Sequence, residues 1–301
     1  MTYSIIARDE VAGHLGMAVQ SHFLAVGHKA IWGRAGVGMI ASQANVSLDY
    51  GLTGLELLDS GETPATALRK CQVRDTSPDV RQVAMLDAGG RVAAFTGEGC
   101  WDNASHHSQP NVSAQANMVA HSEIPHVMVE TFLSTDGSFE HKLLAALDSA
   151  EMLGGDLRGR QSSALFVVNG ERKTAPNDGV IVDLRIDNSP EPLRELRLAS
   201  ELNSALQLVW PVIRGAACRG PVAPTPDETE SAIEVLSAAQ VVYGRGNLEP
   251  SFWKAIALER AGRKSESDQL ISTISQNHAG WYELYTSILR RGSAAEKSGT
   301  K

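Results

Sequence analysis

The chain has 301 residues, with 27 Lys and Arg against 35 Asp and Glu, which gives a formal net charge of -8 at pH 7. Hydrophobic residues make up 43% and charged residues 21%, so a disordered chain is excluded. The acid excess argues against a nucleic-acid or anionic-membrane partner, because phosphate binding needs clustered Lys and Arg. This length is ample for one large domain with a small appendage.

The cysteines and apolar runs place the chain in a broad class. Cys71, Cys100 and Cys218 lie far apart, show no zinc-site spacing and, being an odd number, make a poor disulfide framework. The longest apolar runs are too short to span a bilayer, and no basic region precedes an apolar stretch near residue 1. We therefore expect a cytoplasmic protein.

The first forty residues predict β-strands. Thr2–Ala7 and Leu15–Gln20 are rich in β-forming residues and flank the turn-type residues Asp9–Gly13, which indicates a hairpin. Two shorter strands are expected at Ala30–Trp32 and Val37–Ser42. The chain thus opens as an antiparallel β-structure.

Two helices and a second hairpin are expected next. Helical spacing runs over Leu52–Ser60 and Pro64–Cys71, and Thr63 before a proline is a suitable N-cap. Val83–Leu86 and Val92–Phe95 flank a turn with two glycines, which suit the positive φ angles of tight turns.

The following segments complete the main domain. We expect a loop over Gly99–Pro110 and strands over Asn111–Val119, Gln161–Val168 and Gly179–Ile186. Helices are expected over Ile124–Ser134 and Phe139–Ala150, between the first and second of these strands, and over Pro190–Val212 after the third. The strands come in hairpins and the helices in pairs, whereas parallel βαβ units would alternate. We therefore predict an α+β fold of two mostly antiparallel sheets covered by helices.

The C-terminal third differs in composition. Residues 219–230 hold three prolines and several acids and are interpreted as a linker after a domain over 1–218. Residues 231–293 show helical apolar stripes that loosely resemble tetratricopeptide-type hairpins, with too few copies for a free-standing stack. Residues 294–301 are predicted to be a disordered tail. This appendage suggests a homodimer.

Thr2 is the most informative position for chemistry. Methionine aminopeptidase removes Met1 when the next residue is small, and Thr2 would then carry a hydroxyl and a free α-amino group. That amine has an ordinary pKa of about 7.7–8.0 and can act as a general base near neutral pH. A hydroxyl beside its own base is the N-terminal form of an activated nucleophile.

Several motifs in order resemble one known family over roughly residues 2–215. They are Thr2-Tyr3-Ser4-Ile5-Ile6-Ala7-Arg8-Asp9, Ser21-His22-Phe23-Leu24-Ala25-Val26-Gly27, Trp32-Gly33-Arg34-Ala35-Gly36-Val37-Gly38, Tyr50-Gly51, Gly54-Leu55-Glu56-Leu57-Leu58, Ala94-Phe95-Thr96-Gly97, Gln115-Ala116-Asn117-Met118 and Gly154-Gly155-Asp156-Leu157-Arg158-Gly159-Arg160-Gln161-Ser162. The sequence is identified as a member of the domain of unknown function 1028 family, which is grouped with the N-terminal-nucleophile (Ntn) hydrolases. That resemblance implies a four-layer αββα sandwich and hydrolysis of an amide by the N-terminal residue.

The resemblance also implies roles for other residues. Arg34 stands where proteasome-type members place a basic group that lowers the pKa of the nucleophile, or it pairs with an acid such as Asp156. Asp156 and Ser162 are candidates to orient the N-terminal amine, or Asp156 caps a turn while Arg158 packs on the surface. Asn117 is a candidate oxyanion donor, or it satisfies backbone groups at a strand end.

The remaining candidates concern substrate and metal. Ser21, Ser4, Gln161 and Arg158 are candidate substrate-binding residues. The pair His106-His107, with His121 and His126 further on, does not predict a metal site, because adjacent loop histidines rarely share one metal and no carboxylate or Cys stands at ligand spacing.

Two functional hypotheses follow. The first is an Ntn-type amidohydrolase that cleaves a small amide through Thr2, with no metal and no organic cofactor. The alternative is a non-catalytic ligand-binding or scaffold protein on the same fold.

Overall fold

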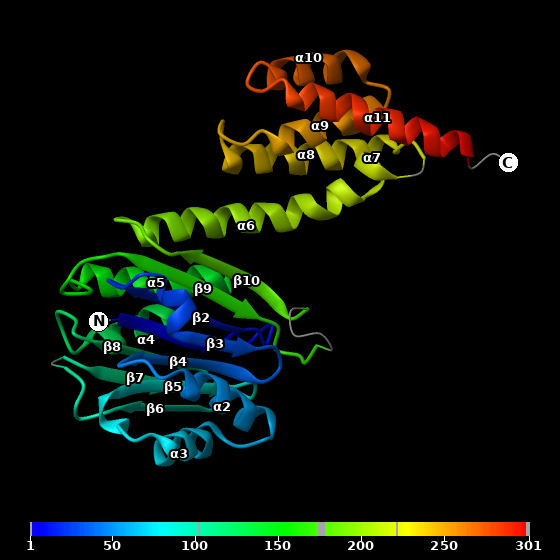
Figure 1. The fold of residues 1–301 in the computed structure, drawn as a ribbon. Helices are drawn as coiled ribbons and strands as arrows, with labels where there is room; N and C mark the ends of the chain where they lie inside the picture. The colour runs from blue at the N-terminus through cyan, green and yellow to red at the C-terminus, as the bar shows by residue number, and fades with distance from the viewer. Residues whose placement is uncertain (1, 102, 174–177, 221, 299–301) are drawn as a thin grey trace. The chain divides into compact units, whose positions relative to one another are not determined.

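The computed structural model describes residues 2–101, 103–173, 178–220 and 222–298, with side chains described up to residue 290. The chain divides into two compact units, residues 1–200 and 201–301, and each is described by itself. The first unit contains two antiparallel β-sheets and several helices (Figure 1). The predicted α+β class with two antiparallel sheets is therefore confirmed.

A six-stranded sheet has the strand order β10-β9-β2-β1-β8-β7. Its strands, listed in chain order, are β1 (Thr2–Arg8), β2 (Leu15–Ser21), β7 (Ser105–Gln109), β8 (Val112–Asn117), β9 (Ser162–Val168) and β10 (Val180–Ile186). Ile5 of β1 lies opposite Ala18 on one side and Ala114 on the other. The N-terminal strand is thus central in its sheet, where its backbone is fixed on both sides.

A four-stranded sheet has the order β3-β4-β5-β6. Its strands are β3 (Ile31–Arg34), β4 (Gly38–Ala44), β5 (Arg81–Asp87) and β6 (Val92–Thr96). The predicted β5–β6 hairpin is confirmed. Its turn is closed by Asp87, whose carboxylate accepts from the backbone N–H groups of Gly89 and Arg91, while Gly90 takes a φ of 86° that favours glycine.

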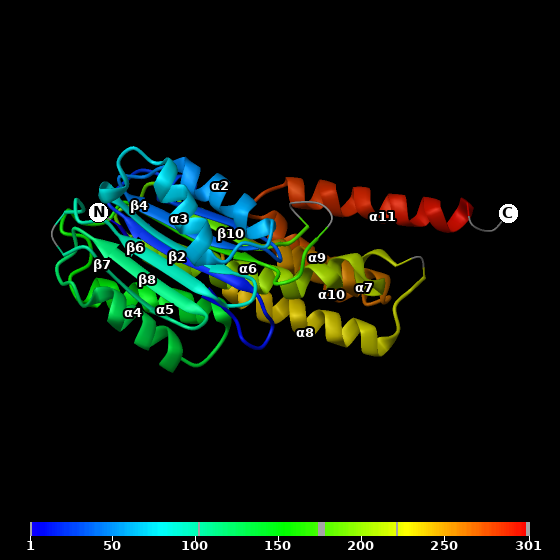
Figure 2. The ribbon, with the colours of Figure 1, turned by 90° about the horizontal axis from the view of Figure 1, so that it is seen from below.

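Two helices cover one face of the six-stranded sheet. Residues of β1 alternate, and Tyr3, Ile5 and Ala7 pack with α4 (Ile124–Ser134) and α5 (Phe139–Met152) in one buried cluster. Of the two, α4 lies beside β7 and β8 (Figure 2), and α5 contacts β1, β2 and β9. Because successive side chains of a strand point to opposite faces, the even-numbered residues of β1 lie on the other face of the sheet.

The other face of the six-stranded sheet meets the four-stranded sheet. Ile6 and Met17 pack there with Met39 and Leu86 in a separate buried cluster. The outer face of the smaller sheet is covered by a second pair of helices, α2 (Leu48–Asp59) and α3 (Pro64–Arg74). Thr63 caps α3, as predicted, by accepting from the N–H of Thr66 at 3.2 Å.

One predicted loop is a strand. Residues 99–110 were expected to be irregular, yet Ser105–Gln109 form β7, the edge strand paired with β8. Its sequence, SHHSQ, contains no apolar residue, so no hydrophobic alternation indicates it. Pairing with a buried neighbouring strand satisfies its backbone and decides its conformation.

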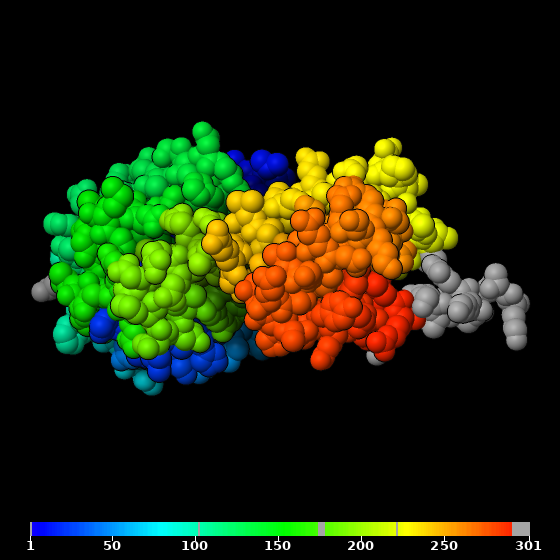
Figure 3. All heavy atoms as spheres, turned by 90° about the horizontal axis from the view of Figure 1, so that it is seen from above, coloured from blue at the N-terminus to red at the C-terminus, as the bar shows by residue number. Residues whose placement is uncertain are grey.

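The short helix α1 (Val26–Lys29) follows β2. The long helix α6 (Pro192–Arg214) follows β10, and the division between the two units falls within it. The second unit continues with α7 (Ala216–Arg219), α8 (Pro226–Tyr243), α9 (Glu249–Arg260), α10 (Lys264–Ser275) and α11 (Gly280–Ser298). Its core is built around Phe252, Ile256 and Leu236. In Figure 3 the helices coloured yellow through red form one closely packed body.

The predicted domain boundaries need correction. The division lies at residues 200 and 201 instead of 218, because the second half of α6 packs into the helical core. The predicted linker 219–230 becomes helical at Pro226, since Thr225 and Glu228 form a capping box there. The predicted tail is helical up to Ser298, and residues 299–301 lie outside the described residues. No helix among the described residues is long and apolar enough to cross a bilayer.

Candidate functional site

Thr2 lies at one end of the central strand, beside two other candidate residues. It is the first residue of β1 and lies opposite Asn117, the last residue of β8. Its hydroxyl donates to the hydroxyl of Ser21, the last residue of β2, over 3.1 Å. Thr2 is 7% exposed, and Ser21 and Asn117 are buried. The structure therefore brings these three predicted residues together.

A buried amide from the other sheet holds the backbone of Thr2. Gln43, in β4, donates from Nε2 to the carbonyl oxygen of Thr2 at 3.1 Å and to Oε1 of Gln82 at 2.8 Å. Its own Oε1 accepts from the hydroxyl of Ser4 at 2.8 Å. Ser4 is 1% exposed and orients Gln43, while its role in substrate binding stays a prediction.

Gln82, in β5, connects this amide to the end of β8. Its Oε1 accepts from Nδ2 of Asn117 at 3.0 Å, and its Nε2 donates to the carbonyl of Ala116 at 2.9 Å and to Oγ1 of Thr96 at 3.0 Å. Both ends of the Gln82 amide are therefore used. We call Thr2, Ser4, Gln43, Gln82 and Asn117 the amide network.

Two buried oxygens beside this network have no hydrogen-bond partner among the described residues. They are Oδ1 of Asn117 and Oε1 of Gln115. An unpaired buried polar atom costs about 1–3 kcal/mol. A buried acceptor without a partner calls for an explanation, and Asn117 carries one directly opposite Thr2 in the strand pair.

Asp156 acts on the turn that follows Ser21. Its side chain is fully buried and accepts from the backbone N–H of His22 at 2.8 Å and of Arg158 at 2.9 Å, with an ion pair to the Arg158 guanidinium at 3.2 Å. Because His22 follows Ser21 directly, this carboxylate positions the end of β2. Asp156 thus caps the turn to Arg158, which is also its ion-pair partner, and its role in orienting the N-terminal amine stays a prediction.

Ser162 and Gln161 have other contacts. Ser162 lies opposite Ser21, but its hydroxyl donates to the carbonyl of Phe23 at 2.5 Å and accepts from the N–H of Val26 at 3.1 Å. It therefore orders the segment before α1. Gln161 donates to the side chain of Asn188 at 3.1 Å on the exterior.

Arg34 lies at the wrong end of the smaller sheet for its predicted role. It stands opposite Gly38 at the start of β4, and its guanidinium donates to Asp59 at 3.1 Å. Gln43, which contacts Thr2, is five positions further along β4, or about 16 Å at about 3.3 Å per residue. The predicted place of Arg34 beside Thr2 is wrong, and its acid partner is Asp59 instead of Asp156.

The other face of β1 is held by a cluster of polar side chains that the sequence did not indicate. The buried hydroxyl of Tyr3 donates to the carboxylate of Glu151, which also accepts from Gln20 and from Arg160, each at 2.5 Å. Burial, and then the Glu151 charge, raise the pKa of Tyr3 well above its ordinary value. Tyr3 therefore stays a neutral donor, and the strand that carries Thr2 is held from both faces.

A polar cavity of about 460 Å³ adjoins the amide network. Its lining includes Thr96, Cys100, Trp101, Asn103, Ser105 and His106. Gln82 donates to Thr96 and to the carbonyl of Ser105, so two lining residues are also partners of the network. Burial raises the pKa of the Cys100 thiol, which favours its protonated form.

Comparison with known proteins identifies the family. The model of a family of unknown function, DUF1028, matches residues 2–196. This chain belongs to the DUF1028 family. A solved structure of a DUF1028 protein, SPO2555 from Silicibacter pomeroyi, is similar with a TM-score of 0.61 and 32% identity, covering 68% of this chain and 89% of the other. The match falls on the unit that holds the amide network.

A second solved structure is more distant. It is Anbu, the ancestral β-subunit, from Yersinia bercovieri, with a TM-score of 0.33 and 13% identity, covering 71% of this chain and 98% of the other. No curated protein matches the chain.

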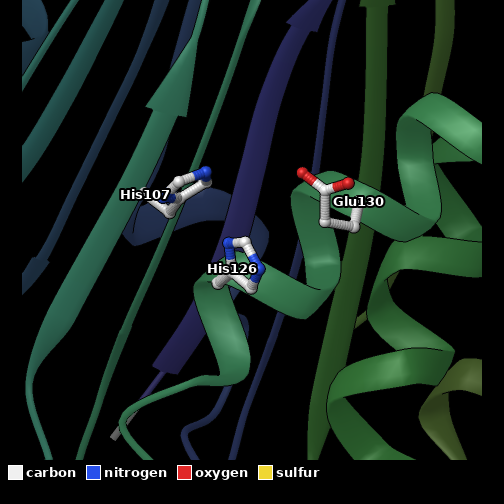
Figure 4. A group of neighbouring side chains, drawn as sticks. All are labelled: His107, His126 and Glu130. Atoms are coloured by element: carbon white, nitrogen blue, oxygen red, sulfur yellow. The ribbon is translucent and has the colours of Figure 1, made fainter.

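Three side chains of the kinds that bind metal ions also lie close together, although the sequence predicted no metal site. Potential ligand atoms of His107, His126 and Glu130 lie within 4.8 Å of one another (Figure 4). The expectation that no carboxylate stands at ligand spacing was wrong, because His126 and Glu130 are four residues apart on α4 and share one helix face. That spacing was the available signal.

Proposed function

We propose that this DUF1028 chain is an Ntn-type amidohydrolase that cleaves a small amide with Thr2 as its nucleophile. The observation that carries the proposal is the placement of Thr2 at the end of a central strand, with its hydroxyl bonded to Ser21 and its carbonyl held by Gln43. Catalysis by a hydroxyl needs this fixed geometry. The fold that we infer is the four-layer αββα sandwich, with the helix pairs α4–α5 and α2–α3 as outer layers.

In the proposed reaction each proton that the Thr2 amine takes up is given back within the cycle. Removal of Met1 exposes the Thr2 amine, which takes the proton of Oγ1 as that oxygen attacks the amide carbon. The tetrahedral intermediate breaks its C–N bond, and the ammonium group gives the proton to the leaving amine. Water then attacks the resulting ester of Thr2, losing a proton to the same amine, and the acid product leaves with Oγ1 protonated again.

Asn117 has a different role in this proposal from the one that its residue type suggested. One N–H of its amide nitrogen donates to Gln82, and its buried Oδ1 has no described partner. Because Asn117 lies directly opposite Thr2, we propose that Oδ1 accepts from the Thr2 amine. That bond would hold the amine beside Oγ1, while Asp156 and Arg158 position Ser21 through His22.

The first experiment is the intact mass and N-terminal sequence of untagged protein, followed by a screen of acyl p-nitroanilides. We expect a mass that lacks Met1, Thr as the first residue, and turnover of at least one short acyl substrate. Thr2→Ser should keep measurable turnover, whereas Thr2→Ala and a chain with a fixed N-terminal extension should lose it.

The alternative function gives a different result. Retained Met1 in all molecules, or full turnover by Thr2→Ala, would overturn the nucleophile. Ligand binding that is the same in the native chain and in Thr2→Ala, with no turnover in either, would indicate the non-catalytic binding protein. The predicted small amide substrate and homodimer remain predictions.

A further inference from the structure

Three side chains from two elements meet at the edge of the six-stranded sheet. His107 extends from β7, and His126 and Glu130 extend from successive turns of α4 (Figure 4). Their potential ligand atoms lie within 4.8 Å of one another, with His107 half-buried and the other two exposed. Strand and helix thus contribute together, and no single segment of sequence contains the group.

The His107 ring has an unsatisfied nitrogen. Its Nε2 is buried and has no hydrogen-bond partner among the described residues. The ring meets that of His126 edge-on, with centroids 4.7 Å apart and planes at 86°. A buried imidazole nitrogen without a partner costs free energy, and a metal ion at this position would supply the partner.

The carboxylate of Glu130 is already oriented. Gln109, two residues after His107 on the same side of β7, donates from Nε2 to Oε1 of Glu130 at 2.9 Å. This bond leaves the second oxygen of Glu130 for a metal. Metal-binding carboxylates are commonly held by such a neighbouring hydrogen bond.

We propose that His107, His126 and Glu130 bind one transition-metal ion of the Zn²⁺ type, with water as the fourth ligand. Two imidazoles and a carboxylate suit Zn²⁺ or Co²⁺ and do not suit Mg²⁺ or Ca²⁺, which prefer oxygen ligands. Ligand atoms on one tetrahedral zinc lie about 3.3–3.6 Å apart, given bonds of about 2.0–2.2 Å. Small rotations of the exposed side chains of His126 and Glu130 reach that separation.

The metal site does not share the face of the sheet that carries Thr2. His107 lies opposite Ala114, which belongs to the core beneath α4. Asn117, three residues further along β8, therefore points to the other face, toward Gln82. The metal would join the edge strand β7 to α4, and its expected effect is on the stability of that edge.

The test uses the full chain, freed of metal with EDTA and titrated with ZnCl₂ by calorimetry and with CoCl₂ by absorption. We expect one ion per chain, a visible tetrahedral Co²⁺ spectrum, and a higher Tm with Zn²⁺. His126→Ala and Glu130→Gln should each weaken binding by at least about 10–100-fold, and Gln109→Ala by about tenfold. Because His126 and Glu130 are exposed, these variants should fold.

Two controls separate this site from other histidines and from Thr2. His121→Ala and His141→Ala, which remove exposed histidines outside the group, should bind Zn²⁺ like the native chain. Thr2→Ala should also bind normally, so failure of the hydrolase proposal leaves this one standing. Absence of saturable binding below 100 µM (about −5.5 kcal/mol) would overturn the metal site. So would a Zn²⁺ affinity of His126→Ala and Glu130→Gln equal to that of the native chain.

Discussion

The two faces of β1 differ in chemistry although they belong to one seven-residue strand. Tyr3, Ile5 and Ala7 are buried against helices in an almost wholly apolar cluster. On the other face Thr2 and Ser4 enter the amide network, which crosses to the second sheet. An apolar face stabilises a fold without further conditions, whereas buried amides do so only when each finds its partner.

That difference indicates where function resides. Apart from the Tyr3 hydroxyl, which donates to Glu151, the apolar face needs only shape and volume, so it explains folding. The polar face places several amides at the one strand end that carries Thr2 and leaves the Asn117 oxygen unpaired. A hydrophobic contact between the sheets would be simpler, and the proposed role of Thr2 as a nucleophile would account for the polar arrangement.

The strongest test of the comparison is Thr2→Ala. If the polar face exists for catalysis, loss of Oγ1 should reduce turnover by at least about 10³-fold, equivalent to about 4 kcal/mol of barrier. Its free energy of unfolding should change by about 1 kcal/mol, the usual contribution of a hydrogen bond such as the one from Oγ1 to Ser21. Urea unfolding and the p-nitroanilide assay measure the two effects, and a large loss of stability would contradict the separation.

Ile5→Ala tests the apolar face of the same strand. Ile5 is fully buried under the helices, so its truncation leaves a cavity and should cost about 2–5 kcal/mol of unfolding free energy. Turnover by the folded fraction should stay near that of the native chain. Measuring activity below the unfolding midpoint checks this, and a specific loss of turnover would show that both faces serve the site.

Gln82→Leu tests whether the amides act as one unit. Its removal deprives Nδ2 of Asn117 of its acceptor and Nε2 of Gln43 of one of its acceptors, which should cost about 2–3 kcal/mol and lower turnover. The matched control is Gln161→Leu, whose amide contacts Asn188 on the exterior and should cost less than about 0.5 kcal/mol. Equal unfolding free energies for the two variants would show that the network is not coupled.

The smallest expected effect is a pH dependence beside the network. Arg81, which precedes Gln82, makes two hydrogen bonds to Asp75, at 2.7 and 3.2 Å, and chiefly this contact lowers the pKa of Asp75 from 3.8 to about 2. Because the folded pKa is the lower one, the stabilisation is present above about pH 4 and is lost as the pH falls toward 2.

Asp75→Asn checks that assignment. The variant should lose about 1–2 kcal/mol at pH 7 and show a smaller decrease in stability between pH 4 and 2 than the native chain. The neutral amide network should contribute nothing to this slope, so Gln82→Leu should keep the native one. An unchanged slope in Asp75→Asn would assign the acid sensitivity to other carboxylates.

Local sequence patterns predicted much of the fold. The hairpins, the helices Ile124–Ser134 and Phe139–Met152, and the Thr63 cap follow from turn residues, periodicity and capping chemistry within a few positions. The failures lie where tertiary contacts decide. The strand β7 has no apolar pattern, and α8 begins earlier than the proline-rich composition suggests.

The candidate site shows the same division. Thr2 and Ser21 could be associated from the sequence because a hairpin places the two ends of its strands side by side, whereas Asn117 was a candidate only through the family resemblance. Arg34 could not be excluded, because its distance from Thr2 depends on how the second sheet is registered against the first. Glu151 was missed because it lies on a helix end far along the chain from its partner Tyr3.

The sequence by itself determined the family, the α+β class and a threonine at position 2, since these depend on residue identity and short-range pattern. Only the tertiary structure decided that Gln43 and Gln82 hold Thr2, that Asp156 supports Ser21, and that His107 meets His126 and Glu130. The physical reason is that side-chain hydrogen bonds and metal ligands act over about 3 Å, while the residues that supply them are many positions apart in the chain.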